Sequence, residues 1–286
     1  MSARRLEGKP LVERRRAALR DDVATLTKMG RAPHLVVVLA TEDEAAVAYA
    51  RAKQRAGEAL GIMVEVVRFE HPTTEALVDK VDALGRDGLV DGILIETPIS
   101  PGIDLRAVQD AIPGAKDVDG AGTLALGSLF RGAAAFVPAT AAAVMALLDG
   151  YDVEISGRHA VVVGRSLVVG RPLSQLLLAR DATVTVCHSR TRHLAAMTQT
   201  ADILCVAVGS PQFLSGSMVK PGAVVIDVGT TAVDGKLVGD VDFDVVASVA
   251  EAVSPVPGGI GPLTTIMLLE NVARAARLQR HEQAER

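Results

Sequence analysis

Tyr49 and Lys53 are a pair of side chains whose types and spacing suit catalysis. They stand four residues apart in a predicted helix over 42–60, so they share one face of that helix. Glu96 and Asp119 stand at or just beyond predicted strand ends, and ligands of parallel α/β sheets bind outside the carboxyl ends of the strands. A phenol, an amine and two carboxylates in one cleft could perform acid–base chemistry. The alternative is that Lys53 is an ordinary solvated lysine in a helix rich in alanine, arginine and lysine.

A second candidate site is the turn that follows the buried apolar run 160–163. Gly164 and Gly170 stand six residues apart, which is not the usual GxGxxG spacing, and a helix is predicted from about Leu173 to Ala179. Glycines in such a turn let the backbone approach a phosphate, and the helix start offers free N–H groups. The alternative is that the glycines only let the strand and the helix pack together.

Polar and basic residues follow the next predicted strand, 183–187. Ser189 and Arg190 stand where the ribose 2′ position of a dinucleotide is read, and Arg165, beside Ser166 in the glycine turn, adds a second cation. A basic residue there suits a 2′-phosphate, whereas an acidic residue suits a free hydroxyl. We therefore predict NADP rather than NAD as the cofactor. A solvated loop arginine is the alternative, although two arginines converging on one turn favour the phosphate.

The segment 254–264, SPVPGGIGPLT, is a third candidate. Its prolines and glycines predict a rigid, irregular loop, and a helix over 265–283 follows directly. Such a loop suits the neighbourhood of a ligand at a helix start. A hinge between two lobes is the alternative, and the two roles are compatible.

Strands and helices are predicted to alternate along the chain, which indicates an α/β fold with a parallel sheet covered on both faces. Further strands are expected at 34–40, 62–70, 92–96, 203–208 and 224–228, and further helices at 11–29, 74–86, 105–112 and 140–148. The helix over 140–148, after a connection rich in glycine and alanine, marks the passage between two lobes. Residues 229–243 are expected to form a loop and a hairpin.

Composition narrows the class of protein. The 286 residues carry a net charge of −4 and only 2% aromatic residues, which argues against nucleic-acid binding. Cys187 and Cys205 fit no metal motif and are expected to be reduced, buried cysteines of a cytoplasmic protein. The charged N-terminus predicts no signal peptide, and no apolar run is long enough to span a bilayer.

Several motifs together resemble the methylenetetrahydrofolate dehydrogenase/cyclohydrolase family, in the family's order. The matching segments are YARAKQRAGEALGI from Tyr49, DGILIETPIS from Asp91, KDVDG from Lys116, VVVGRSLVVGRP from Val161, ATVTVCHSRT from Ala182, PGAVVIDVG from Pro221, GDVDF from Gly239 and SPVPGGIGPLTT from Ser254. KDVDG and PVPGGIGP are highly specific.

The resemblance implies a two-lobed α/β homodimer that uses NADP to oxidise 5,10-methylenetetrahydrofolate to the methenyl form. Water then opens the methenyl form to 10-formyltetrahydrofolate. A parallel-sheet folate-binding catalytic domain is expected over 1–140, completed by the C-terminal helix over 265–286. A Rossmann-like NADP-binding domain is expected over 141–264. The family's roles fall on Tyr49 and Lys53 (catalysis), Asp119 (catalysis and pterin binding), Pro257, Gly258 and Gly259 (substrate loop, to Pro262), and Gly164, Arg165, Ser166, Gly170, Ser189 and Thr230 (cofactor).

Several positions depart from the family pattern. Ala46, Ala125, Ser128, Ala139 and Ala141 replace motif residues of the family. The PCTPxG segment keeps only its first proline and its threonine. These changes leave two further hypotheses open: a relative that acts on an altered folate or another small substrate, and a non-catalytic folate- or dinucleotide-binding paralogue.

Glu96 is the departure with a direct chemical consequence, because the family has glutamine beside its catalytic lysine. A carboxylate within hydrogen-bond distance favours the protonated amine of Lys53 and leaves less of it free for proton transfer. Hydride transfer depends more on orientation than on a titrating base. We therefore predict that Glu96 takes part in catalysis and that dehydrogenase activity survives better than cyclohydrolase activity.

Overall fold

The computed structural model describes residues 3–284 and divides into two compact units. One comprises Arg14–Val137 with the chain from Thr265 onward and is called the 14–137 unit; the other comprises the chain up to Glu13 with Pro138–Thr264 and is called the 138–264 unit. The last helix belongs to the first of these, as expected. The start of the chain differs from expectation, because residues up to Glu13 cluster with the 138–264 unit.

The 14–137 unit contains a three-stranded parallel sheet in the order β3-β2-β4. Its strands are β2 (His34–Leu39), β3 (Met63–Arg68) and β4 (Gly92–Ile95). β2 is buried along its whole length, as its unbroken apolar sequence predicts. The helices are α2 (Glu44–Glu58), α3 (Thr74–Arg86), α4 (Leu105–Asp110), α5 (Thr123–Phe130) and most of α1 (Lys9–Lys28) and α10 (Ile260–Ala284).

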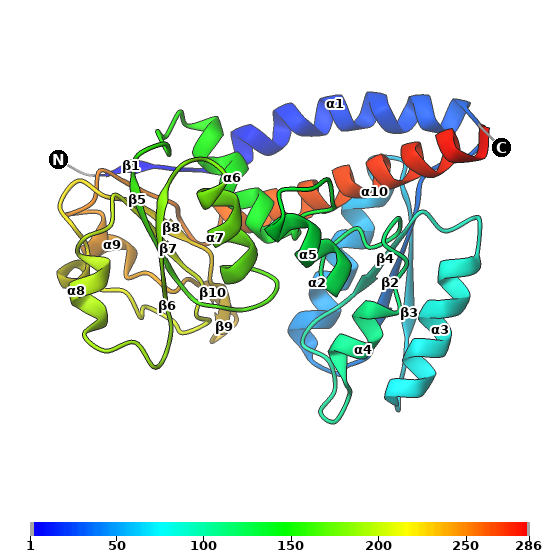
Figure 1. The fold of residues 1–286 in the computed structure, drawn as a ribbon, viewed down its shortest axis with the longest axis horizontal. Coiled ribbons are helices and arrows are strands. Elements are labelled where there is room, and N and C mark those ends of the chain that lie inside the picture. Colours follow the sequence, from blue (N-terminus) through cyan, green and yellow to red (C-terminus); the bar gives the residue numbers. More distant parts are fainter. Residues whose placement is uncertain (1–2, 285–286) are drawn as a thin grey trace. The chain divides into compact units, whose positions relative to one another are not determined.

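Helices pack on both faces of this sheet (Figure 1). Val36 and Val38 of β2 share a buried cluster with Leu77 and Val81 of α3. Neighbouring residues on a strand point to opposite faces, so the other face must be covered separately. On that face a Cβ added to Gly57 of α2 would lie 2.4 Å from Val64 of β3. Close packing of α2 on the sheet therefore fixes where this helix presents its polar side.

The 138–264 unit contains a six-stranded sheet in the order β1-β11-β8-β7-β5-β6, with every neighbouring pair parallel. Its strands are β1 (Arg4–Arg5), β5 (His159–Val163), β6 (Thr183–Cys187), β7 (Ile203–Val206), β8 (Val224–Asp227) and β11 (Ala252–Val253). Within Pro138–Thr264 the chain first forms β5, adds β6 on one side, and then returns to add β7 on the other. This reversal is the feature that defines the ligand crevice of doubly wound sheets.

Short helices and one hairpin complete the 138–264 unit (Figure 1). They are α6 (Ala139–Gly150), α7 (Gly170–Leu178), α8 (Leu194–Thr198), a 3-10 turn (Gly216–Met218) and α9 (Phe243–Val246), with the antiparallel pair β9 (Thr231–Val233) and β10 (Lys236–Val238). α7 packs on β5 and β6, so its first residue lies at the carboxyl end of β5. The α/β class, the parallel sheets and the expected hairpin are confirmed.

Two expectations about local structure are wrong. The stretch after Gly120 is not only a loose connection, because it contains α5. The irregular segment expected to reach Thr264 ends earlier, because α10 already begins at Ile260. Proline is tolerated in the first turn of a helix, where its missing N–H has no partner to lose, so Pro262 does not delay the start. Of the helices in residues 3–284, none is both long and apolar enough to cross a membrane.

Candidate functional site

Lys53 and Glu96 form a largely buried ion pair in the 14–137 unit. The Lys53 Nζ atom donates hydrogen bonds to both carboxylate oxygens of Glu96, at 2.8 Å each. Only 5% of Glu96 is exposed, and 14% of the Lys53 side chain. A two-oxygen contact of this kind between opposite charges is strong and directional. The predicted juxtaposition of these two side chains is therefore present.

Tyr49 completes this group from one turn earlier on α2. The Lys53 Nζ atom lies 5.6 Å from the centroid of the Tyr49 ring, within the range of a cation–π contact. The Tyr49 residue is 43% exposed, which is high for a large aromatic side chain. The Lys53 ammonium thus contacts the Tyr49 ring, while much of the phenol stays accessible to a planar ligand.

The backbone around Glu96 explains why a carboxylate can be placed there. Glu96 follows β4 directly, and its N–H donates to the carbonyl of Val38 on β2 at 2.9 Å. The Asp43 side chain caps α2 by accepting the N–H of Ala46 at 2.8 Å, which fixes the start of the helix. The strand end and the capped helix together set the positions of Glu96 and Lys53.

The KDVDG segment contains two buried charged residues, Lys116 and Asp117, and the half-buried Asp119. Asp117 is buried and accepts N–H groups from Ala121 and Gly122 at 3.1 and 2.9 Å. The Lys116 ammonium donates to the carbonyls of Leu84 and Asp87. These contacts hold the loop. Asp119 is half-buried and stands two residues after Asp117, which forms a parallel bridge with Ile93 of β4.

Burial raises the pKa of the Asp117 carboxyl, although backbone N–H groups oppose the shift. Burial likewise lowers the pKa of the Lys116 ammonium, against the attraction of Asp87 and Asp91. Both side chains form hydrogen bonds with backbone groups of their own unit. We therefore treat them as supports of the loop that carries Asp119.

Four of the departures from the family pattern, Ala125, Ser128, Ala139 and Ala141, lie on α5 and α6. Ala125 of α5 is buried, while Leu124 and Phe130 of the same helix are 78% and 72% exposed. Ala139 and Ala141 are buried in the first turn of α6. Nothing in the structure explains the apolar exposed residues of α5.

The glycine turn of the 138–264 unit requires glycine at both predicted positions. Gly164 has φ +130°, and a Cβ added to it would lie 2.3 Å from the carbonyl oxygen of Ala207. A Cβ on Gly170 would lie 2.1 Å from the carbonyl oxygen of Gly164. The Ser166 Oγ atom accepts the N–H of Val169 at 3.1 Å. The turn is thus folded tightly against the start of α7, as a phosphate cradle needs.

Two arginine side chains belong to this turn and to the neighbouring turn after β6. Arg165 and Arg190 are exposed, and within residues 3–284 neither guanidinium group has a hydrogen-bond or ion-pair partner. After β6 the His188 N–H donates to the Thr191 hydroxyl at 2.9 Å, and the Arg190 N–H donates to His188 Nδ1 at 3.1 Å. This compact turn leaves Ser189 exposed and the Arg190 guanidinium available to an anion.

The Pro257–Gly259 segment is anchored on the start of the chain. The Gly8 N–H donates to the carbonyl of Gly258 at 2.8 Å, and a Cβ on Gly8 would lie 2.1 Å from the Gly259 carbonyl oxygen. The Gly259 N–H donates to the Pro255 carbonyl. The predicted rigid loop is therefore present up to the start of α10, and it belongs to the 138–264 unit.

Two buried aspartates at the carboxyl end of this sheet are not among the predicted site residues. Asp227 and Asp240 are 2% and 0% exposed, and Asp240 lies in the GDVDF segment. Thr230, a predicted cofactor residue, is exposed and stands between them in the chain. Burial of a single aspartate leaves no periodic signal in a sequence, so only the motif itself could have indicated Asp240.

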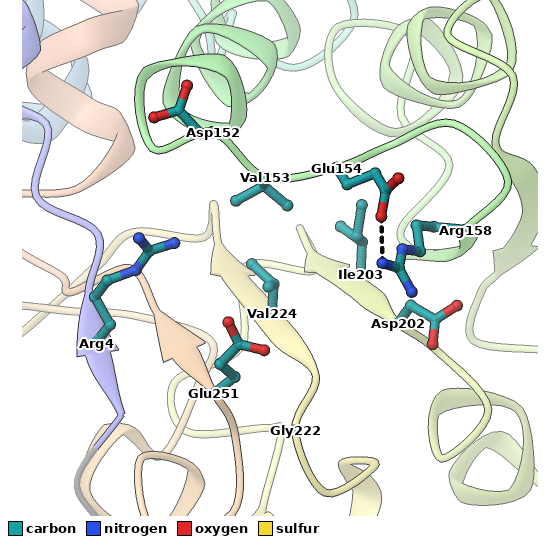
Figure 2. Close-up of a pocket in the computed structure, with 10 residues that line it drawn as sticks. All are labelled: Arg4, Asp152, Val153, Glu154, Arg158, Asp202, Ile203, Gly222, Val224 and Glu251. Atoms are coloured by element: carbon teal, nitrogen blue, oxygen red, sulfur yellow. Dashed lines mark hydrogen bonds and ion pairs between the residues drawn. The ribbon is translucent and has the colours of Figure 1, made fainter.

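A cavity of about 270 Å³ lies at the opposite, amino end of the same sheet (Figure 2). Arg4 and Glu251 line it at the starts of β1 and β11, and the ion pair of Arg158 with Glu154 lines it beside β5. Ligands of doubly wound sheets bind at carboxyl ends, so this cavity is separate from the glycine turn. It contains none of the predicted site residues.

The fold and these sites define a class of protein: a two-unit α/β chain with a doubly wound, Rossmann-like unit that carries a glycine turn, and a second unit with a lysine–carboxylate pair. Comparison with known proteins agrees with this class. Residues 6–119 match the tetrahydrofolate dehydrogenase/cyclohydrolase catalytic domain, and residues 138–280 match the NAD(P)-binding domain of the same family.

Individual relatives cover nearly the whole chain. The bifunctional protein FolD of Halalkalibacterium halodurans is 46% identical over 278 residues, which span 97% of this chain and 100% of the relative. A crystal structure of the FolD methylenetetrahydrofolate dehydrogenase/cyclohydrolase from Campylobacter jejuni has a TM-score of 0.92 and 37% identity, covering 96% of this chain and 98% of the other. The Trypanosoma brucei FolD enzyme, solved with NADP and an inhibitor, has a TM-score of 0.92 and 36% identity, covering 97% and 98%.

The chain therefore belongs to the tetrahydrofolate dehydrogenase/cyclohydrolase family.

Proposed function

We propose that the protein oxidises 5,10-methylenetetrahydrofolate to 5,10-methenyltetrahydrofolate with NADP, and then hydrolyses the methenyl form to 10-formyltetrahydrofolate. The observation that carries this proposal is the buried pair of Lys53 and Glu96 beside the exposed ring of Tyr49. Relatives that match nearly the whole chain are named as bifunctional enzymes of this chemistry.

The catalytic roles toward the folate fall on the 14–137 unit. We assign the exposed face of Tyr49 to the planar part of the substrate and Lys53 to proton transfer and orientation. We assign Asp119, whose carboxylate can accept hydrogen bonds, to the pterin. Pro257, Gly258 and Gly259 form the loop that we assign to the substrate, since their backbone is fixed by contacts to Gly8 and Pro255.

NADP is the cofactor that suits the 138–264 unit. When bound, it accepts a hydride from the folate. The backbone of Gly164 and Gly170 allows a phosphate to approach the start of α7, since no Cβ fits at either position. Arg165, Ser189 and Arg190 offer cations and a hydroxyl to a 2′-phosphate, and Ser166 holds the turn. We assign Thr230, which is exposed beside the buried Gly229, to the same cofactor.

Glu96 is expected to set the balance of the two activities. Its carboxylate holds the Lys53 ammonium through two hydrogen bonds and opposite charge. Hydrolysis needs a group that gains and loses a proton, whereas hydride transfer needs orientation. We therefore propose that the hydrolytic step is slower than the oxidation in this protein, while both are present.

Assembly and location follow the expectations from the sequence. We propose a homodimer in the cytoplasm, with a tetrahydrofolate as the small-molecule partner and no nucleic acid or membrane partner. Two free, buried cysteines, Cys187 and Cys205, and the net charge of −4 support the location and the absence of nucleic acid. Sedimentation analysis of the purified chain tests the dimer, since a monomer at micromolar concentration would contradict it.

The experiment that tests the function uses purified protein, 5,10-methylenetetrahydrofolate and either NADP⁺ or NAD⁺. Absorbance of the reduced cofactor follows oxidation, and reduction of NADP⁺ faster than NAD⁺ is expected. Binding of both ligands without turnover would favour a non-catalytic paralogue and contradict the proposal.

A further inference from the structure

Asp240 accepts three consecutive backbone N–H groups from the loop that follows β7. The N–H groups of Val208, Gly209 and Ser210 lie 2.6, 3.0 and 2.7 Å from its carboxylate oxygens. The residue is fully buried. The Asp240 carboxylate thus holds a single short loop in shape. Hydrogen bonds to a charged acceptor are stronger than those between neutral groups.

That loop lies where this sheet is expected to bind a ligand. β5 is flanked by β6 and β7, so the strand order reverses between β5 and β7, and ligands bind in the crevice at such a reversal. The loop also touches the glycine turn, because a Cβ on Gly164 would lie 2.3 Å from the Ala207 carbonyl oxygen. Residues 207–210 therefore form a wall of the same crevice that Gly164 enters.

Asp227 in turn fixes Asp240. The Asp227 carboxylate accepts the N–H groups of Asp240 and Val241, each at 3.0 Å. A Cβ on Gly239 would lie 1.9 Å from an Asp227 carboxylate oxygen. Two buried carboxylates, those of Asp227 and Asp240, thus link the end of β8 to the loop after β7.

The segment that carries Thr230 is packed on the same group. A Cβ on Gly229 would lie 2.0 Å from the Asp240 carboxyl carbon, so the backbone next to Thr230 rests directly on this carboxylate. One buried side chain therefore contacts both segments that border the crevice on the β7–β8 side.

We propose that Asp240 is a positioning residue for NADP binding, which acts by holding residues 208–210 and supporting Gly229, and that Asp227 holds Asp240 in place. The inference rests on the proposed function. Binding sites keep their geometry when supporting hydrogen bonds fix the residues that touch the ligand. A role in folding alone would lower stability and leave the affinity of the folded protein for NADP⁺ unchanged.

The test compares NADP⁺ dissociation constants by titration calorimetry for the wild type and the Asp240→Asn variant. The amide nitrogen of asparagine cannot accept an N–H, so at least one loop hydrogen bond is lost. We expect binding to weaken on the order of tenfold, with oxidation at saturating NADP⁺ changed much less. Asp202→Asn is the matched control: Asp202 accepts the His159 N–H and the Lys220 ammonium at the amino end of the same sheet, so its loss should leave NADP⁺ affinity unchanged.

A second variant and a second measurement cover the case in which Asp240→Asn does not fold. Gly239→Ala displaces the Asp227 carboxylate without removing a charge and should weaken NADP⁺ binding in the same way. In the wild type, hydrogen exchange of residues 207–213 should slow when NADP⁺ is added. Folded variants with wild-type affinity, or unchanged exchange in this segment, would overturn the positioning role. A wild type that does not bind NADP⁺ would instead overturn the proposed function.

Discussion

Lys53 contacts both carboxylate oxygens of Glu96 at 2.8 Å, in a setting where the glutamate is 5% exposed. The lysine comes from the middle of α2 and the glutamate from the residue after β4, so the pair joins a helix to the end of the sheet. Such a pair fixes the position of the ammonium and stabilises its charge at the same time. The fixed position helps Lys53 to orient a substrate, whereas the stabilised charge hinders it from exchanging a proton.

Replacing Glu96 by glutamine should raise methenyl hydrolysis relative to oxidation, on the order of tenfold. The amide still accepts a hydrogen bond from Lys53 but no longer stabilises its charge. Separate assays of NADP⁺ reduction and of methenyl decay measure the ratio. Glu70→Gln is the control, because Glu70 is exposed after β3 and has no partner within the described residues. An unchanged ratio in Glu96→Gln would contradict the role given to the carboxylate.

Lys53→Met should lower the free energy of unfolding by about 3 kcal/mol, because it leaves the buried Glu96 carboxylate without its counter-charge. The double variant Lys53→Met, Glu96→Gln should recover most of this loss, since no buried charge remains. Urea unfolding measures each value. Lys28→Met, at the exposed end of α1, should change stability by less than about 0.5 kcal/mol. Equal losses in the single and double variants would show that the pair is not coupled.

Arg190→Ala should reduce the preference for NADP⁺ over NAD⁺ by about 10- to 100-fold, the effect of losing one charged hydrogen bond to a phosphate. The affinity for NAD⁺ should change little. Titration of both nucleotides gives the preference. Arg180→Ala serves as the control, because that guanidinium is paired with Asp149. A parallel loss for both nucleotides would place Arg190 outside the 2′-phosphate site.

Burial, with a smaller contribution from the neighbouring Asp240 carboxylate, raises the pKa of Asp227 to about 7, against the N–H groups of Asp240 and Val241. The folded protein then binds more protons than the unfolded chain between about pH 4 and pH 7. The stability from this group is complete below about pH 4 and is lost progressively as the pH rises from about 4 to about 7, at up to about 1.4 kcal/mol per pH unit.

Urea unfolding at several pH values, compared between the wild type and Asp227→Asn, isolates this contribution from other titrating groups. The free energy of unfolding of the wild type, minus that of Asp227→Asn, should fall as the pH rises from 4 to 7. A difference that stays constant over this range would show that Asp227 has the same pKa in both states.

Much of the fold could be predicted from the periodicity of apolar residues. The strand Thr183–Cys187 and the helix Thr74–Arg86 have the predicted bounds, because a β-branched run and a capped amphipathic pattern carry clear signals. α5 was not predicted, because its apolar residues surround the helix and give no face. The early start of α10 was hidden by Pro262, which usually ends regular structure but is allowed in a first turn.

Site residues could be predicted where they stand close together in the sequence. They could not be predicted where only the tertiary fold brings them together. Tyr49 and Lys53 are one helical turn apart, so their proximity could be inferred from the sequence. The meeting of Lys53 with Glu96 was indicated by the rule that strand ends gather ligand-binding residues, and by the resemblance to a family with glutamine beside its lysine. Asp240 reaches residues 208–210 across about thirty positions of chain, and no local pattern indicates such a contact.

The most direct test of this account follows the methenyl intermediate during turnover of the wild-type protein with 5,10-methylenetetrahydrofolate and NADP⁺. If Glu96 slows the hydrolytic step, methenyltetrahydrofolate should accumulate while NADPH is formed, and it should decay faster than it does without enzyme. NADPH formation with no build-up of the methenyl form would show that hydrolysis keeps pace with oxidation. That result would contradict the central claim that the Lys53–Glu96 pair limits proton transfer.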